Sequence, residues 1–305
     1  MLSRRRFYDW TLLLVCNLIW ASQFAMVKLV QEQMGPLFAV FFPMAISTAL
    51  LIPIVQREFR PQVSRADIGR FILIGVAGQV AAQLFITWGT RLSLASNAAL
   101  LSLVLPVSTA VMAHFLLGER MTRLRWVSFA LAICGVAACS GVDWSSLNLS
   151  SGQYLAGNLM ILVSVNGSAF YNAYSKKLLQ RYSPLQVLLY SYYAVIAFLA
   201  PITAAMEPAS FGDLPHFSPT VWIGLAILAL FQYFLSMVIF LNVLTRLDAT
   251  QAAVSNYLIP FFGLVLAAII LGEKFTGAMI AGGMLVLAST LLMTVSEVRD
   301  SRGPG

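Results

Sequence analysis

Charged residues are scarce in this chain. Only 10% of its 305 residues are Asp, Glu, Lys or Arg, whereas 59% are hydrophobic. A soluble globular domain carries roughly 25% charged residues, so this composition excludes an ordinary soluble protein and predicts that lipid is the main solvent. The net charge of +7 comes from residues between apolar segments, which argues against nucleic acid as a partner.

Metal-ligating and catalytic side chains are also few. The three cysteines lie inside apolar segments without metal-ligand spacing, and only two histidines occur. No Asp or Glu falls in the middle of an apolar segment, so the clustered acids, bases or metal ligands of a membrane enzyme are missing. The sequence therefore predicts no enzyme, no metal and no cofactor, and it argues against a carrier that couples ions through a membrane carboxylate.

Apolar segments of about 20 residues, the length that crosses a bilayer, occur ten times. They lie roughly at residues 10–30, 35–56, 68–90, 93–117, 124–141, 154–176, 185–206, 219–244, 249–271 and 275–296. Short connections hold most of the charges and leave no room for a further soluble domain. The sequence predicts an all-α integral membrane protein with ten transmembrane helices.

Basic residues divide unevenly between the two sides of this arrangement. If the N-terminus is cytoplasmic, only Lys28, Arg91 and Lys274 lie outside, which leaves 16 of the 19 Lys and Arg inside. Because cytoplasmic loops carry the excess of Lys and Arg, the division supports an even number of spans. It predicts a plasma (inner) membrane protein with both termini cytoplasmic and residues 297–305 as a cytoplasmic tail.

The second half of the chain repeats the first. A four-residue motif that closes a long apolar segment returns after 154 residues: Leu117-Gly118-Glu119-Arg120 and Leu271-Gly272-Glu273-Lys274. Its glutamates are expected at helix ends near the membrane surface. Five spans per half is an odd number, so the second half must be upside down relative to the first. The sequence predicts two inverted five-helix repeats, residues 9–141 and 154–296.

Several motifs resemble the drug/metabolite transporter superfamily, specifically its ten-helix members with two EamA domains. The stretch Trp20-Ala21-Ser22-Gln23-Phe24-Ala25-Met26-Val27-Lys28 is similar to the family's W-G-S-x-F-x-x-x-K opening, with alanine for glycine. Segments that fit the second, fourth and ninth spans are Pro36-Leu37-Phe38 with Pro53, Pro106 to Glu119, and Pro260 to Glu273. The resemblance covers nearly the whole chain and implies export of small organic metabolites, amino acids or related amphiphiles among them.

One position departs from the family pattern. Pro43 stands where many relatives have an arginine, so the role of that arginine does not transfer to this chain.

Polar and aromatic side chains recur in six of the expected spans. An amide that faces lipid is costly, so these side chains are expected to face the interior. Hydrogen bonds between helices explain any single one, whereas the whole set predicts the lining of a polar cavity. The candidates are Trp20, Gln23, Lys28, Gln79, Gln83, Asn97, Ser102, Asn166, Tyr171, Asn172, Gln232, Tyr233, Asn256 and Tyr257.

Lys28 and two prolines each have two interpretations. Lys28 lies near the outer end of its span, where it either snorkels to the headgroups or lines the outer part of the cavity. Pro106 and Pro260 each precede the glycine of the repeated motif by twelve residues and interrupt a span. Each proline is either a hinge beside the transport path or a simple packing kink.

Together these patterns predict a transporter that works by alternating access, with the halves rocking around a central site. Amides, hydroxyls and aromatic rings suit a neutral or zwitterionic molecule with an apolar part. The expected partners are a small-molecule substrate and the lipid bilayer, and the oligomeric state stays open. The alternatives are a non-transporting membrane scaffold or regulator and a polytopic membrane enzyme.

Overall fold

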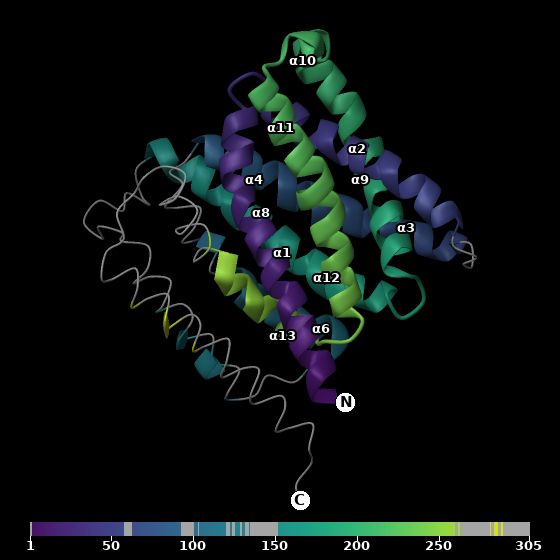
Figure 1. Ribbon diagram of the computed structural model, residues 1–305, viewed down its shortest axis with the longest axis vertical. Helices are drawn as coiled ribbons and strands as arrows, with labels where there is room; N and C mark the ends of the chain where they lie inside the picture. Colours follow the sequence, from purple (N-terminus) through teal and green to yellow (C-terminus); the bar gives the residue numbers. More distant parts are fainter. Residues whose placement is uncertain are drawn as a thin grey trace, which may run out of the picture.

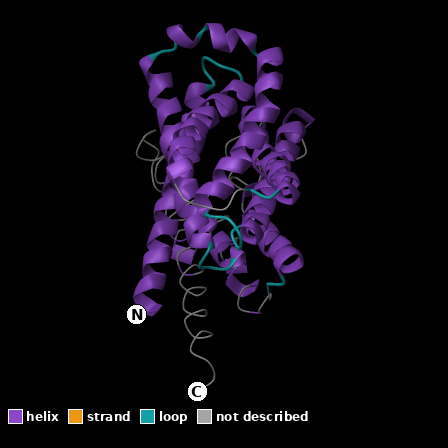
Figure 2. Cartoon of the chain, turned by 90° about the vertical axis from the view of Figure 1, so that its right-hand side faces the viewer, coloured by secondary structure: helices purple, strands orange, loops and turns teal. Residues whose placement is uncertain are grey.

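The computed structural model describes residues 2–57, 63–92, 101–102, 104–119 and 152–259, with scattered positions at 123–134 and 262–288. Every regular element in these ranges is a helix, and none of the described residues forms a strand (Figures 1 and 2). The all-α membrane fold expected from the sequence is confirmed. Most of the fifth and tenth expected spans and much of the ninth, with Pro260, lie outside the described residues.

The first half begins with two long helices and a third that is interrupted. Its elements are α1 (Leu2–Val30), α2 (Pro36–Arg57), α3 (Arg65–Leu73), the π-helix η1 (Ile74–Val80), α4 (Ala81–Leu92) and α6 (Val104–Leu117). Ser64 caps α3 through its hydroxyl, and Gly118 ends α6 with a φ of 72°, a conformation that glycine adopts without strain.

The second half follows the same order. Its elements are α8 (Gly152–Leu178), α9 (Pro184–Met206), α10 (Pro208–Gly212), the 3₁₀ turn η2 (Leu214–His216), α11 (Pro219–Ile227), the π-helix η3 (Leu228–Leu235), α12 (Ser236–Leu244), α13 (Ala249–Val254) and the 3₁₀ turn η4 (Ser255–Tyr257). A serine cap followed by proline in the first turn begins both α9 and α11, because proline fixes a helical φ where no backbone donor is needed.

Five continuous helices in the described residues are long and apolar enough to cross a membrane. They cover Arg6–Val30, Pro36–Arg57, Arg65–Leu92, Pro184–Met206 and Pro219–Leu244. These ranges correspond to the first, second, third, seventh and eighth expected spans. The α6 helix is a shorter apolar helix in the fourth, and α8 covers the sixth over 27 residues.

Helices of one half pack mainly against helices of the other. The α2 helix contacts α9, α6 contacts α13, α4 contacts α8, and α1 contacts α11 and α12 (Figure 1). If each span of the first half is exchanged with the equivalent span of the second, the α1–α12 contact becomes the α8–α4 contact. The α2–α9 pair and the α6–α13 pair remain the same pairs. A two-fold relation between the halves produces this pattern of contacts.

The two helix pairs that this exchange leaves in place are antiparallel. Glu207 at the end of α9 accepts hydrogen bonds from the Leu37 and Phe38 backbone N–H groups, at 3.1 and 2.8 Å, at the start of α2. Glu119 at the end of α6 does the same for Ala249 and Thr250, at 2.8 and 3.0 Å, at the start of α13. Antiparallel pairing is what inverted repeats require of equivalent spans.

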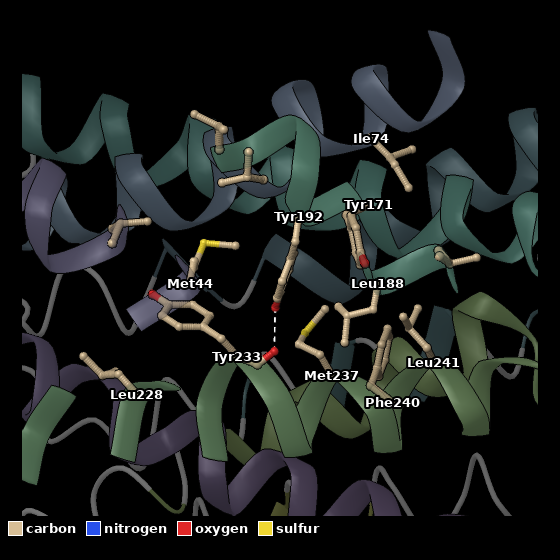
Figure 3. Close-up of a cluster of buried hydrophobic side chains, with 14 of the residues drawn as sticks. Met44, Ile74, Tyr171, Leu188, Tyr192, Leu228, Tyr233, Met237, Phe240 and Leu241 are labelled. Carbon is tan, nitrogen blue, oxygen red and sulfur yellow. Dashed lines mark hydrogen bonds between the residues drawn. The ribbon is translucent and has the colours of Figure 1, made fainter. Parts of the chain in front are cut away.

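The two π-helices occupy equivalent places in the halves, since η3 begins 154 residues after η1. A π-helix breaks the regular backbone ladder and frees carbonyl groups, which need other partners inside a membrane. The Ser47 hydroxyl donates to the Ala229 carbonyl at 2.6 Å, and the Tyr192 hydroxyl donates to the Tyr233 carbonyl at 2.6 Å (Figure 3). Side chains of α2 and α9 thus hold η3 in place.

Candidate functional site

A cavity of about 120 Å³ lies between the two halves. First-half residues from α1, η1, α4 and α6 line it, as do second-half residues from α8, η3, α12 and η4. One water needs roughly 10–15 Å³ and drug-sized ligands roughly 300–1,000 Å³, so the space suits a small metabolite.

Most of the predicted cavity residues meet here. They are Trp20, Gln23, Gln79, Gln83, Ser102, Tyr171, Asn172, Gln232 and Asn256. The six helical spans that contribute them come from both halves, and their polar groups meet at the cavity, where an amide avoids the cost of facing lipid unpaired.

Other predicted residues lie elsewhere. Lys28 is exposed and is not among the residues that line the cavity. Asn166 is exposed on the outer face of α8, where its amide donates to the Leu162 carbonyl at 2.9 Å. Tyr233 and Tyr257 are packed among helices at 1% exposure and are not lining residues.

Asn97 and Pro260 lie outside the described residues. Pro106 is buried within α6.

Two serines of α8 line the cavity although the sequence did not single them out. Ser164, Ser168 and Asn172 are spaced by four residues and so share one helix face. Ser164 also donates to the Ala82 carbonyl of α4 at 2.6 Å. This four-residue spacing could have identified the two serines from the sequence. The apolar residues of the wall could not be identified in this way, because apolar residues occur throughout a chain this hydrophobic. These apolar residues are Ala82, Ile86, Leu105, Val165, Met237 and Ile259.

A chain of amide hydrogen bonds crosses the cavity wall. Gln232 Nε2 donates to Gln23 Oε1 at 2.8 Å, and Gln23 Nε2 donates to Gln83 Oε1 at 2.8 Å. The chain joins η3 of the second half to α1 and α4 of the first. It leaves an acceptor at the Gln232 end and a donor at the Gln83 end.

The Trp20 ring is fixed beside this chain. Its Nε1 donates to Ser236 Oγ at 2.9 Å, and Ser236 Oγ in turn donates to the Gln232 carbonyl. The Trp20 and Phe240 ring centroids lie 5.2 Å apart. Trp20 therefore presents a rigid aromatic surface to the cavity.

Two buried amides at the cavity retain unused hydrogen-bonding atoms. Asn256 and Gln232 are each 4% exposed. Both amide atoms of Asn256, and Gln232 Oε1, have no protein partner. No Asp, Glu, Lys or Arg is among the described residues that line the cavity, and the described part of the chain holds no group of three potential metal ligands.

Ion pairs join the helices on the face where α1 begins, called here the α1-start face. Arg246 NH2 lies 2.6 Å from Asp9 Oδ1, and Lys176 Nζ lies 3.6 Å from Glu119 and 3.1 Å from Asp248.

On the same face, Tyr182 donates to Asp67 at 2.6 Å. Burial and this hydrogen bond raise the pKa of Tyr182, so its hydroxyl stays a donor at neutral pH.

This chain is similar to known proteins in both sequence and structure. The sequence profile of the EamA-like transporter family matches residues 10–141 and 155–295. A probable terminal-alkyne amino-acid exporter of Streptantibioticus cattleyicolor is 28% identical over 97% of both chains. A probable amino-acid metabolite efflux pump of Salmonella typhimurium is 28% identical over 92% of both. A solved structure described only as a crystal structure of a protein superposes with a TM-score of 0.77 at 16% identity, covering 96% of this chain and 98% of that one.

An all-helical membrane bundle with related halves and a cavity between them defines the class as a polytopic membrane transporter. Since the profile matches both halves, the chain belongs to the EamA-like transporter family. Its membrane setting and small-molecule cargo follow from that membership, and the names of its relatives point to transporters rather than enzymes.

Proposed function

We propose that the protein exports small amphiphilic metabolites, amino acids or close relatives among them, through a plasma membrane by alternating access. The observation that carries this proposal is the position of the cavity: residues of both halves line it, and the glutamine chain joins the halves across it. A site shared by two inverted halves opens to either side when one half rocks against the other.

The lining supports the class of cargo. Amides and hydroxyls accept or donate hydrogen bonds, while Trp20, Tyr171 and the aliphatic wall contact an apolar part. Two relatives are described as exporting amino acids or their metabolites, which supports the same class and the same direction. The excess of basic residues in connections that share a side with the N-terminus supports cytoplasmic termini.

The proposal is tested with purified protein in liposomes loaded with unlabelled metabolites. Entry of the matching labelled metabolite by exchange is expected for at least one member of a panel of amino acids and related amphiphiles. Protein-free liposomes give the background rate.

The Gln23→Leu variant serves as the internal test of the site. It removes the middle of the glutamine chain and leaves Gln83 and Gln232 without their partners, so flux should fall roughly tenfold or more. Asn166→Leu, an amide removed from the exposed face, should transport like the wild type. The transport proposal would be wrong if liposomes with the wild-type protein took up every metabolite of the panel at the same rate as protein-free liposomes.

A further inference from the structure

The cavity wall carries three fully buried amide atoms that no protein group satisfies. They are Nδ2 and Oδ1 of Asn256 and Oε1 of Gln232, on residues that are each 4% exposed. A buried polar atom without a protein partner is destabilising unless water or a ligand satisfies it, and in a cavity a ligand can replace the water. Both residues line the same cavity.

The hydrogen-bond chain sets which Gln232 atom is free. Gln232 Nε2 is engaged by Gln23, whose own amide donates onward to Gln83. Turning over the Gln232 amide alone would place two carbonyl oxygens against each other. In this orientation of the three amides, the chain presents the Gln232 oxygen as an acceptor.

The unused atoms add up to one NH₂ donor and two oxygen acceptors. A carboxylate alone only accepts, so it would leave both oxygens unsatisfied, and an ammonium alone only donates, so it would leave Asn256 Nδ2 unsatisfied. The α-ammonium and α-carboxylate of an amino acid would match the three atoms only as two separate charged groups. A primary carboxamide has two N–H donors and one carbonyl acceptor, which matches all three atoms. We propose that Asn256 and Gln232 form a carboxamide-selecting edge and that the cargo is a small, net-neutral molecule bearing a primary carboxamide.

The rest of the lining agrees with this edge. No charged side chain is present among the described lining residues to neutralise a net charge on the cargo, and an unpaired charge in a buried site is costly. The opposite charges of a zwitterion offset each other. The space of about 120 Å³ favours a molecule of the size of a small amino acid. The inference rests on the proposed transport function and narrows its substrate.

Three amino acids of nearly equal shape separate the chemistries. L-asparagine carries the carboxamide, L-aspartate a carboxylate and L-leucine two methyl groups. Binding to the purified full-length protein is measured by thermal stabilisation, and flux is measured by exchange in liposomes. L-asparagine should bind and move at concentrations roughly tenfold or more below those of the other two. All three share the α-ammonium and α-carboxylate, and only the L-asparagine side chain can pair all three buried amide atoms.

Substitutions of the edge should change this order in a defined way. Asn256→Leu should abolish the preference for L-asparagine over L-leucine. Asn256→Asp replaces the donor by an acceptor, so it should favour L-2,4-diaminobutyrate, whose side chain ends in an ammonium group. Asn166→Leu removes an amide that lies outside the cavity and should keep the wild-type order.

Each contrary outcome has a separate meaning. Equal affinity of the wild type for L-asparagine and L-leucine, or an unchanged preference in Asn256→Leu, overturns the carboxamide edge while transport stands. If Asn256→Leu does not fold, the polar Asn256→Asp variant decides by its preference between L-asparagine and L-2,4-diaminobutyrate. Binding of none of the three amino acids also overturns the edge, and movement of another panel member then shows that the transport proposal survives.

Discussion

Glu119 shows what a single residue of the repeated Leu-Gly-Glu motif contributes. Its carboxylate accepts from the backbone N–H groups of Ala249 and Thr250, and from the Thr250 hydroxyl at 2.7 Å. It also lies 3.6 Å from Lys176 Nζ. One side chain of the first half thus satisfies the start of a second-half helix, where unpaired backbone donors attract an anion.

Replacing Glu119 by Ala is therefore expected to lower the free energy of unfolding by about 1.5–3 kcal/mol, because charged hydrogen bonds at a helix start are lost. The measurement is the thermal unfolding midpoint of purified protein in detergent. Glu32→Ala is the matched control, since Glu32 is exposed. Equal midpoints for the two variants would show that the carboxylate does not hold α13.

At the scale of elements, close helix contacts determine where the cavity wall lies. Gly167 of α8 packs directly on α4: a Cβ atom added there would lie 2.8 Å from the Ala81 Cβ and 2.9 Å from the Ala82 backbone nitrogen. Both neighbours are rigid parts of a helix. Ala82 and Ser168, beside this contact, line the cavity.

Gly167→Ala should consequently force α4 and α8 apart, lower the free energy of unfolding by about 1–3 kcal/mol and reduce flux. Thermal unfolding and liposome exchange report the two effects. The same substitution at Gly69 meets nothing within 4 Å and should be neutral or slightly stabilising, because alanine is the better helix former. A Gly167→Ala protein as stable as the Gly69→Ala protein contradicts the close contact.

The helices also show which parts of the fold can be predicted from the sequence. Hydrophobic length and the distribution of Arg and Lys predicted α1, α2, α9 and the spans that contain η1 and η3, because lipid burial depends on composition over about 20 residues. The π-helices were not predicted. They depend on distant partners, such as Ser47 for Ala229, and no local pattern encodes these partners.

The cost of burying a polar group led from the sequence to the polar residues that line the cavity. Gln23, Gln232 and Asn256 have to face the interior, and they line the cavity. Asn166 does not need to face the interior, because its amide donates to a carbonyl of its own helix. Lys28 does not need to either, because its ammonium is at an exposed position and is not buried. Small hydroxyls such as Ser168 were missed because a serine in a helix costs little whichever way it faces.

At the scale of the whole molecule, different kinds of contact join the two halves at the two faces of the bundle. Among the described residues, the ion pairs lie on the α1-start face, where Asp9 meets Arg246 and Lys176 meets Glu119. On the opposite face, Gln33 accepts from the Ser218 backbone and Glu207 from the start of α2. Lys28 is the sequence counterpart of Lys176 but is exposed. The halves are thus held by charge at one face and by neutral or capping contacts at the other.

The Asp9–Arg246 pair joins the halves, and the Asp9 side chain is only 4% exposed. Asp9→Arg and Arg246→Asp should each lower the free energy of unfolding by about 1.5–3 kcal/mol, because each leaves like charges facing one another at a 2.6 Å contact. The double variant restores opposite charges and should recover most of the loss. Thermal or denaturant unfolding of the four proteins gives the coupling energy directly. If the losses of unfolding free energy in the two single variants simply add in the double variant, the two residues do not interact. If the double variant recovers both stability and liposome flux, the contact between the halves also takes part in the transport cycle.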